Sequence, residues 1–160
     1  MSIAYRPRAP EDTPHIGGFW RQRWGDEYIV AHGRTFRPED VEGFVAVQEG
    51  QWVGLATCAL QETGCEIVSL DSLQEGCGIG SRLLAEIAAA ASRAGCRRLF
   101  LTTTNDNLRA LGFYQKRGFV LSALRPGALA RARQLKPAIP LTGMNGIPLR
   151  DEIELERSLP

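Results

Sequence analysis

The chain has 160 residues and a mass of 17.6 kDa, which suits one hydrophobic core and leaves little room for a second. Hydrophobic residues make up 44% and charged residues 23%, a composition that excludes an intrinsically disordered chain. The 19 Lys and Arg against 18 Asp and Glu give a net charge of +1, so no overall positive excess favours a nucleic acid partner.

The cysteines are Cys58, Cys65, Cys77 and Cys96. Their spacing contains no CxxC pair, so it predicts no metal site and favours reduced thiols in a cytoplasmic protein. The first residues contain arginines but no apolar segment, and no run of 18 apolar residues occurs anywhere. We therefore expect a protein that is neither secreted nor membrane-spanning.

The first half of the chain predicts a strand, a helix and a three-stranded meander. Alternation over residues 2–8 indicates a strand, and apolar spacing of three and four over 11–23 indicates a helix that ends at Trp24 and Gly25. Residues 28–38 show no clear period, so we expect an irregular loop over a site. The antiparallel strands of the meander are expected at 43–47, 52–60 and 65–70.

The second half alternates between helices and strands. Residues 71–80 are expected as a loop with three glycines that leads into an amphipathic helix over 81–94, which Gly95 ends. The remaining elements are expected as a strand at 98–104, a helix at 107–117, a strand at 119–124, helical turns at 128–135, a connection rich in Pro and Gly at 136–148, and a last strand at 153–156.

The segment from Leu73 to Ser81 reads LQEGCGIGS and joins an apolar strand to a helix. Glycines allow positive φ and close approach of a phosphate, and a helix N-terminus carries about half a unit of positive charge. A phosphate-bearing ligand is therefore favoured, while a purely structural turn remains the alternative. A Walker A loop would need GKS or GKT, but the chain has Gly80-Ser81-Arg82.

A Rossmann loop is also excluded. It would need Gly or Ala at Ser81 and an acidic residue at the end of the next strand, where threonines occupy residues 102–104. A second segment places Asn107, Ala110 and Tyr114 on one helical face, with a small residue between two hydrogen-bonding ends. Such a face suits a ligand channel, and a core Tyr with a helix-capping Asn is the alternative.

Together the two segments resemble the GNAT superfamily of acetyl-CoA-dependent N-acetyltransferases. The loop pattern of that family aligns with Glu75 to Gly80, and its later pattern of Asn, Ala and Tyr followed by Gly-Phe aligns with residues 107–119. The resemblance implies one α/β domain over 1–160, with a mostly antiparallel sheet of six to seven strands and helices on both faces. It also implies that the sheet opens between the strands ending near Leu70 and Thr104.

The resemblance implies direct acetyl transfer from acetyl-CoA to an amine, with CoA as product. It makes Tyr114 the general acid for the leaving thiolate, places Asn107 near the pantetheine arm, and lets Leu70 act through its main chain. The loop residues expected to bind the cofactor are Glu75, Gly76, Cys77, Gly78, Ile79, Gly80 and Ser81. Glu75 departs from the family, which usually has Arg or Gln there, so main-chain amides would carry more of the binding.

The general base and the acceptor contacts rest on the residues themselves. Two-residue alternation puts Glu66 on one strand face with Val68 and Leu70, where it could take the proton of the amine through water. An exposed strand acid without a catalytic role is the alternative for Glu66, and Asp71 is a weaker candidate for the base. The expected acceptor contacts are Trp24, Tyr28, Arg34 and Asp151. Acidic groups would suit a cationic amine and Arg34 a carboxylate, so the acceptor stays open.

Two other classes of protein compete with an enzyme of this family. The runner-up is a non-catalytic acyl-CoA-binding sensor or interaction module on the same fold, which would need the glycine loop but neither Tyr114 nor Asn107. A nucleotide-dependent dehydrogenase conflicts with Ser81 and with the missing acidic residue. The expected partners are acetyl-CoA and an amine, without nucleic acid, membrane or metal, and a homodimer is left open.

Overall fold

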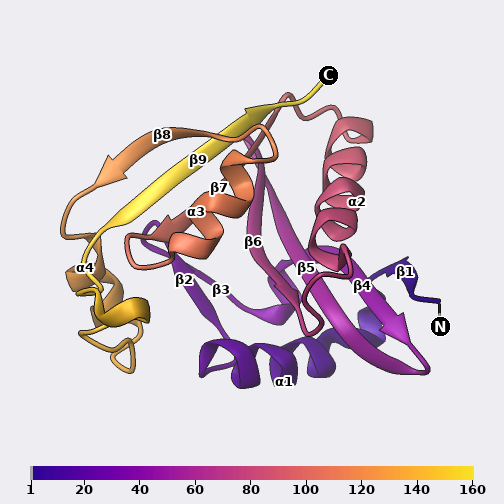
Figure 1. Ribbon diagram of the computed structural model, residues 1–160, viewed down its shortest axis with the longest axis horizontal. Coiled ribbons are helices and arrows are strands. Elements are labelled where there is room, and N and C mark those ends of the chain that lie inside the picture. The colour runs from indigo at the N-terminus through magenta and orange to yellow at the C-terminus, as the bar shows by residue number, and fades with distance from the viewer. Residues whose placement is uncertain (1) are drawn as a thin grey trace.

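The structure of the protein is a computed structural model that describes residues 2–160. The strands of its larger sheet are β1 (Ala4–Pro7), β4 (Glu42–Gln48), β5 (Gln51–Gln61), β6 (Gly64–Ser72), β7 (Arg98–Thr104), β8 (Val120–Arg125) and β9 (Glu152–Ser158). They lie in the order β1-β4-β5-β6-β7-β9-β8 (Figure 1). A separate hairpin pairs β2 (Ile29–Ala31) with β3 (Arg34–Phe36).

The helices are α1 (Thr13–Trp24), α2 (Ile79–Arg93), α3 (Leu108–Gln115) and α4 (Ala128–Leu135), with short 3-10 turns η1 (Pro10–Asp12), η2 (Pro38–Asp40) and η3 (Met144–Gly146). Within residues 2–160, every helix is too short or too polar to cross a membrane. Strands β4, β5 and β6 form the expected antiparallel meander, and β7–β9 and β9–β8 are antiparallel as well. The predicted mixed α/β fold with a largely antiparallel sheet is confirmed.

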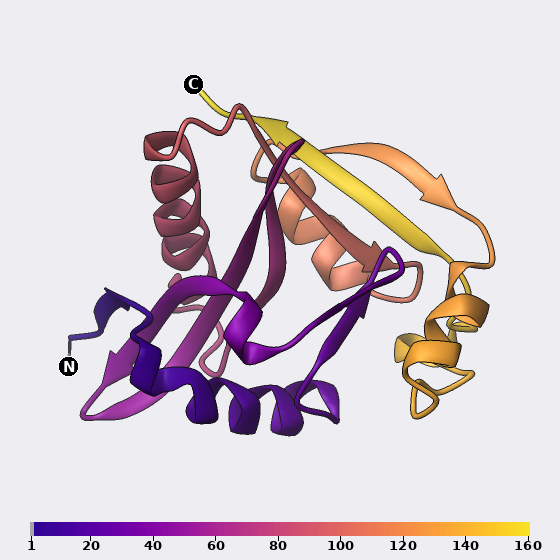
Figure 2. The same cartoon turned by 180° about the vertical axis from the view of Figure 1, so that it is seen from behind.

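Helices cover both faces of the sheet, as expected. On one face, Leu83 and Ile87 of α2 pack in one core cluster with Tyr114 of α3 and with Ala56 and Ile67 of the sheet. On the other face, α1 packs in a second cluster with β4, β5 and the β2–β3 hairpin. Figure 1 shows α3 in front of the sheet. Figure 2 shows the opposite side of the molecule, where α1 and the hairpin are nearest the viewer. Each large apolar side chain buried in this way stabilises the fold by about 1.5–3 kcal/mol.

The sheet opens between β6 and β7, the parallel pair at its centre. The two strands pair only over Cys65–Ile67 and Leu99–Leu101, although β6 continues to Ser72 and β7 to Thr104. Figure 1 shows the two strands separating beyond this short contact. The opening predicted near Leu70 and Thr104 is therefore confirmed, and within residues 2–160 no strand pairs with β6 on that side from Val68 onward.

Residues 28–38 are not the irregular loop that the sequence analysis predicted, because they contain the β2–β3 hairpin. His32 and Gly33 form its turn, and both have positive φ (49° and 72°), the backbone conformation that joins two strands with two residues. Each strand has only three residues, so alternation is too short to be recognised. Helix α2 also begins at Ile79, two residues before the expected start, because Gly78 is its N-cap.

Gly43 of β4 provides a test of the sheet packing. A Cβ at this position would lie 2.1 Å from the Ala56 carbonyl oxygen of β5, so the strands would have to separate. We expect Gly43→Ala to lower the free energy of unfolding in urea by about 3 kcal/mol. Gly18→Ala is the matched control, because its Cβ would contact nothing within 4 Å and Ala favours a helix by about 1 kcal/mol. Equal effects of the two changes would contradict this packing.

Candidate active site

The glycine loop between β6 and α2 is exposed and open. Gly76 and Gly78 both have φ of +73°, and a Cβ built on either would meet nothing within 4 Å. Gly78 is the N-cap of α2, and no side chain among residues 2–160 caps this end of the helix. The first-turn amides of α2 are therefore available to an anion that approaches the loop closely, a fit that suits a pyrophosphate.

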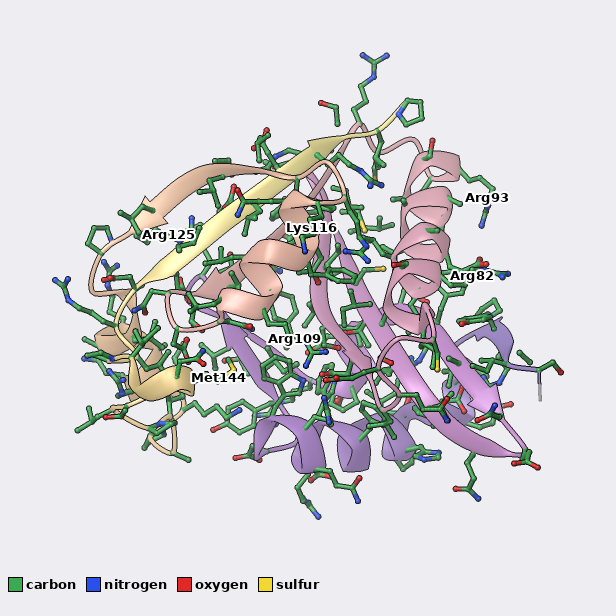
Figure 3. The ribbon with its side chains drawn as sticks, in the orientation of Figure 1. Arg82, Arg93, Arg109, Lys116, Arg125 and Met144 are labelled. Carbon is green, nitrogen blue, oxygen red and sulfur yellow. The ribbon has the colours of Figure 1, made fainter. Side chains whose placement is uncertain are left out.

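Two arginines, Arg109 of α3 and Arg117 just after it, lie beside this loop. Arg117 donates from Nε and Nη2 to Ser81 Oγ, at 3.0 and 2.8 Å, and its guanidinium lies 3.7 Å from the centroid of the Phe113 ring. Glu75, the departure from the family pattern, forms an exposed ion pair of 2.5 Å with Arg109 (Figure 3). An exposed pair contributes at most about 1 kcal/mol, so Arg109 balances the acid without fixing it in place.

Tyr114 lies on the inner face of α3, where its ring is 6% exposed. The ring meets Phe113 and Phe119 edge to face, at centroid distances of 5.1 and 5.2 Å. Its hydroxyl has no hydrogen-bond partner among the described residues. Burial, followed by the negative charge of Asp71, raises the pKa of Tyr114 above its ordinary value, so the phenol keeps its proton at neutral pH and can donate it.

Asn107 begins α3 as its N-cap, and its Oδ1 accepts a hydrogen bond of 3.1 Å from the Ala110 amide. Asn107 therefore has the helix-capping role that the sequence left as the alternative. The side-chain amide nitrogen makes no hydrogen bond with any residue from 2 to 160, so it can still donate to a ligand. Asn107, Ala110 and Tyr114 lie one turn apart in succession on this short helix.

A β-bulge in β6 corrects the expected arrangement of Glu66, Val68 and Leu70. Thr57 pairs with Ser69 and Cys58 with Ile67, so Val68 is an extra residue between them. Val68 packs on the α1 face, whereas Leu70 packs in the cluster of the α2 face. Simple alternation fails here because a bulge reverses the faces of all later residues.

The same bulge turns Asp71 toward α1. Its carboxylate is 8% exposed, accepts a hydrogen bond of 2.9 Å from Trp24 Nε1 and lies 3.6 Å from Arg23 Nε. Burial raises the pKa of Asp71, and its charge is the one that acts on Tyr114. Asp71 therefore joins the end of α1 to the opening of the sheet, a role that only the bulge reveals.

Glu66 is 4% exposed, and its Oε1 accepts a hydrogen bond of 2.7 Å from Gln61 Nε2. Burial raises the pKa of Glu66, while the charge of Arg34 and the bond from Gln61 act in the opposite direction. Because the folded-state pKa lies above the unfolded one, the fold favours the protonated carboxyl. The penalty of ionising Glu66 is absent below the unfolded pKa and grows as the pH rises through the folded pKa.

We therefore expect Glu66→Gln, which cannot ionise, to gain stability relative to the unmodified protein as the pH rises from about 4 to about 7. Thermal unfolding at several pH values measures this difference. Glu49→Gln, in the exposed β4–β5 turn, is the control for the same change of charge without burial. A difference that is constant with pH, or that reverses its sign, would contradict the buried environment of Glu66.

The residues predicted to contact the acceptor are only partly brought together. Trp24 bonds to Asp71, and Arg34 Nη1 donates to Gln61 Oε1, one hydrogen bond away from Glu66. Tyr28 Oη donates to the Leu135 carbonyl at 3.3 Å. Asp151 contacts a different part of the chain: its carboxylate accepts a hydrogen bond of 2.8 Å from the amide of Gly127, the residue before α4.

Lys136 closes this side of the site and was not predicted. Its ammonium is buried and donates to the carbonyls of Trp24 and Tyr28, at 3.4 and 3.1 Å. Burial lowers its pKa. These bonds join the segment after α4 to the loop after α1, so two distant parts of the chain meet beside Trp24. A lysine in a loop rich in Pro and Gly carries no sequence signal for such a contact.

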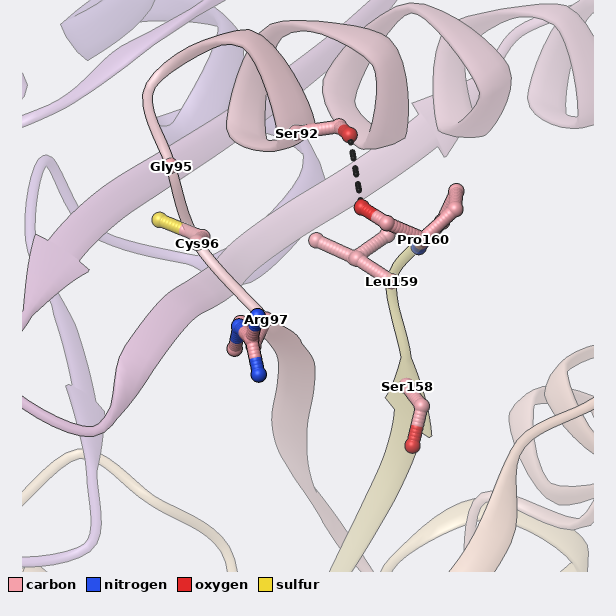
Figure 4. A pocket seen from close by; sticks show the side chains of 7 residues that line it. All are labelled: Ser92, Gly95, Cys96, Arg97, Ser158, Leu159 and Pro160. Atoms are coloured by element: carbon pink, nitrogen blue, oxygen red, sulfur yellow. Dashed lines mark hydrogen bonds between the residues drawn. The ribbon is translucent and has the colours of Figure 1, made fainter.

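A surface pocket of about 610 Å³ lies elsewhere, between the C-terminal end of α2 and the end of the chain (Figure 4). Its lining residues are Ser92, Gly95, Cys96, Arg97, Ser158, Leu159 and Pro160. None of them belongs to the predicted site, which begins at the opposite end of α2. No cluster of His, Cys, Asp or Glu among residues 2–160 could hold a metal ion.

Comparison with known proteins places this arrangement in a family. Residues 8–119 match the protein-family model described as Acetyltransferase (GNAT) family. The Bacillus subtilis (strain 168) protein YdhI, described as uncharacterized, is 44% identical over 136 residues, which are 84% of this chain and 85% of YdhI. YxbD from the same organism, also described as uncharacterized, is 38% identical over 160 residues and 99% of each chain.

Solved structures share the fold. An IAA acetyltransferase from Bacillus cereus ATCC 14579 superposes with a TM-score of 0.71 and 21% identity, over 99% of this chain and 100% of that one. A GNAT family acetyltransferase from Elizabethkingia anophelis with acetyl-CoA bound gives 0.71 and 19%, over 98% of each chain. The chain belongs to the GNAT acetyltransferase family, and its enzyme class is acyltransferase.

Proposed function

We propose that the protein transfers the acetyl group of acetyl-CoA directly to an amine within a ternary complex, with residues 1–160 acting as one domain. The observation that carries this proposal is the uncapped glycine loop at the start of α2, next to the opening between β6 and β7, with the Tyr114 hydroxyl free on α3. The structural relative from Elizabethkingia anophelis, which has acetyl-CoA bound, supports the choice of cofactor.

In this proposal the main-chain amides of residues 75–81 hold the pyrophosphate, with Arg109 and Arg117 nearby. The unpaired edge of β6 around Leu70 offers backbone groups to the pantetheine arm and the carbonyl oxygen, and Asn107 donates from its free amide nitrogen. Bound acetyl-CoA supplies a thioester that an amine can attack and a thiolate that can leave. Cys77 has no nucleophilic role.

Two side chains move protons. Glu66 accepts the proton of the amine through water, and Tyr114 donates its own to the departing sulfur. Glu66 lies in the short paired part of β6, two residues before the opening begins, and Tyr114 lies on the inner face of α3. Burial raises the pKa of both groups, which favours a base strong enough for an ammonium and an acid that remains protonated. Trp24, Tyr28 and Arg34 are proposed to contact the acceptor, and Asp151 remains a prediction.

The test is an assay of acetyl-CoA with a panel of primary amines, with free thiol measured as CoA and the acetylated amine identified by mass spectrometry. Thiol release that depends on an amine, with an N-acetyl product of matching yield, is the expected result. Binding of acetyl-CoA without any amine product would instead favour the non-catalytic acyl-CoA-binding module. A cytoplasmic location is also proposed, supported by four cysteines that are all free thiols.

A further inference from the structure

Two oppositely charged side chains on the acceptor side of the sheet lack an ionic partner. Glu66 of β6 is buried, Arg34 of β3 is exposed, and no ion pair within 4.0 Å joins either to any residue from 2 to 160. Both groups bond to the side-chain amide of Gln61, so they lie on either side of one small polar group. A buried carboxylate without a cation favours a positively charged partner.

The side-chain amide of Gln61 bridges Glu66 and Arg34, and its orientation follows their charges. Its Nε2 donates to Glu66 Oε1 at 2.7 Å, while its Oε1 accepts from Arg34 Nη1. The donor end of this amide therefore faces the carboxylate and its acceptor end faces the guanidinium. An ammonium and a carboxylate attached to one carbon atom present the same polarity in the same order, so the amide occupies the position that such a molecule would take.

Two arginines of the neighbouring strands are already paired with carboxylates. Arg125 of β8 lies 3.1 Å from Glu154 and 3.5 Å from Glu152, both on β9. Arg98 of β7 pairs with Glu154 and with Glu156, the latter at 3.0 Å. Arg34, Arg37 and Lys136 form no ion pair among residues 2–160, and Arg37 and Lys136 lie against the Tyr28 ring. Of these three cations, Arg34 is the one that Gln61 joins to Glu66.

We propose that the acceptor is a small zwitterion of the α-amino acid class, whose amine lies at Glu66 and whose carboxylate binds Arg34 in place of the Gln61 amide. The proposal rests on the proposed acetyl transfer and adds the substrate class to it. Charge-assisted bonds at both ends replace bonds to a neutral amide, and a guanidinium can hold a carboxylate with two parallel bonds.

The chemistry balances without a further reactant. The amine nitrogen forms a bond with the acetyl carbonyl carbon as the carbon–sulfur bond breaks. The ammonium first gives one proton to Glu66 through water, which leaves a neutral nitrogen that can attack. The nitrogen loses a second proton to solvent as the amide forms, and the sulfur takes a proton from Tyr114, which the solvent restores. The products are an N-acetyl amino acid, CoA thiol and one proton released to solvent.

The test compares common L-α-amino acids with their α-carboxamides, which keep the amine but lack the carboxylate, and with diamines. We expect kcat/KM to be at least about tenfold higher for the free acids than for the amides. We expect Arg34→Gln to raise the KM of the acids about 10- to 100-fold and to leave the KM of the amides nearly unchanged. Any change in kcat that arises through Glu66, whose pKa the charge of Arg34 lowers, falls on both substrates alike. Arg93→Gln, at the outer end of α2 (Figure 3), is the matched control and should change neither.

Each outcome separates this inference from the function on which it rests. Amides or diamines that react as well as the acids would overturn the zwitterion proposal and leave acetyl transfer intact. An equal rise in the KM of acids and amides in Arg34→Gln would overturn it as well, because the carboxylate would then not be what Arg34 binds. Failure of acetyl-CoA itself to stabilise the protein against unfolding would contradict the proposed function.

Discussion

Tyr114→Phe is expected to lower kcat about 100- to 1,000-fold while leaving the affinity for acetyl-CoA unchanged, since a positioned general acid contributes a factor of this size. The ring is buried against Phe113 and Phe119, and Phe preserves that packing. The hydroxyl makes no hydrogen bond with another described residue, so its removal leaves no partner unsatisfied and the fold should remain as stable. Steady-state kinetics and a binding titration measure the two quantities separately.

Tyr5→Phe is the control for this change. Tyr5 lies on β1 at the edge of the sheet, where Arg82 packs over its ring at 4.7 Å, away from the opening between β6 and β7. Loss of its hydroxyl should change neither kcat nor binding. If Tyr114→Phe keeps full activity in a folded protein, Tyr114 is not the acid and another donor must protonate the thiolate.

Gly78→Ala is expected to weaken acetyl-CoA binding about 10- to 100-fold, because a methyl group would enter the space that a phosphate needs and disturb the amides around it. The free protein has room for this methyl group, since a Cβ would meet nothing within 4 Å. Its cost to stability should be limited to about 1–2 kcal/mol for a positive φ. Calorimetric titration with acetyl-CoA and urea unfolding measure the two effects.

Gly127→Ala is a closely matched control. Gly127 is the N-cap of α4 with φ 71° and ψ 10°, against 73° and 12° at Gly78, and a Cβ there would also meet nothing within 4 Å. The two changes should therefore destabilise the protein equally and differ only in cofactor binding. Equal affinities for acetyl-CoA in the two variants would mean that the α2 N-terminus does not hold the cofactor.

The sequence predicted the parts of the site that depend on local spacing. A glycine loop before a helix and an Asn, Ala and Tyr on one helical face are set by positions a few residues apart, so they could be read directly. Strand β7 and helix α4 were likewise predicted with the bounds that the structure shows, at 98–104 and 128–135. The spacing of their apolar residues, or the Gly and Pro residues that flank them, defines both ends of each element.

The rest depends on contacts between distant segments. The extra residue Val68 in β6 is visible only in the pairing with β5, and it reverses the faces of Leu70 and Asp71. Gln61 bridges Glu66 and Arg34 only because β3 lies beside the β5–β6 hairpin. An amide at the end of a strand has no chemical signature of its own, so neither the role of Gln61 nor that of Lys136 could be predicted from spacing.

The most direct test of the account is thermal unfolding of the purified protein with acetyl-CoA, CoA, NADH or ATP. A ligand at about 100 times its dissociation constant stabilises the native state by about 2.7 kcal/mol and raises the Tm by about 5–10 °C. We expect acetyl-CoA and CoA to give this rise, and NADH and ATP to give none. A rise in Tm with NADH or ATP alone would contradict the acetyl-CoA site on which the proposed function depends. The absence of a rise with any of the four ligands would contradict it as well.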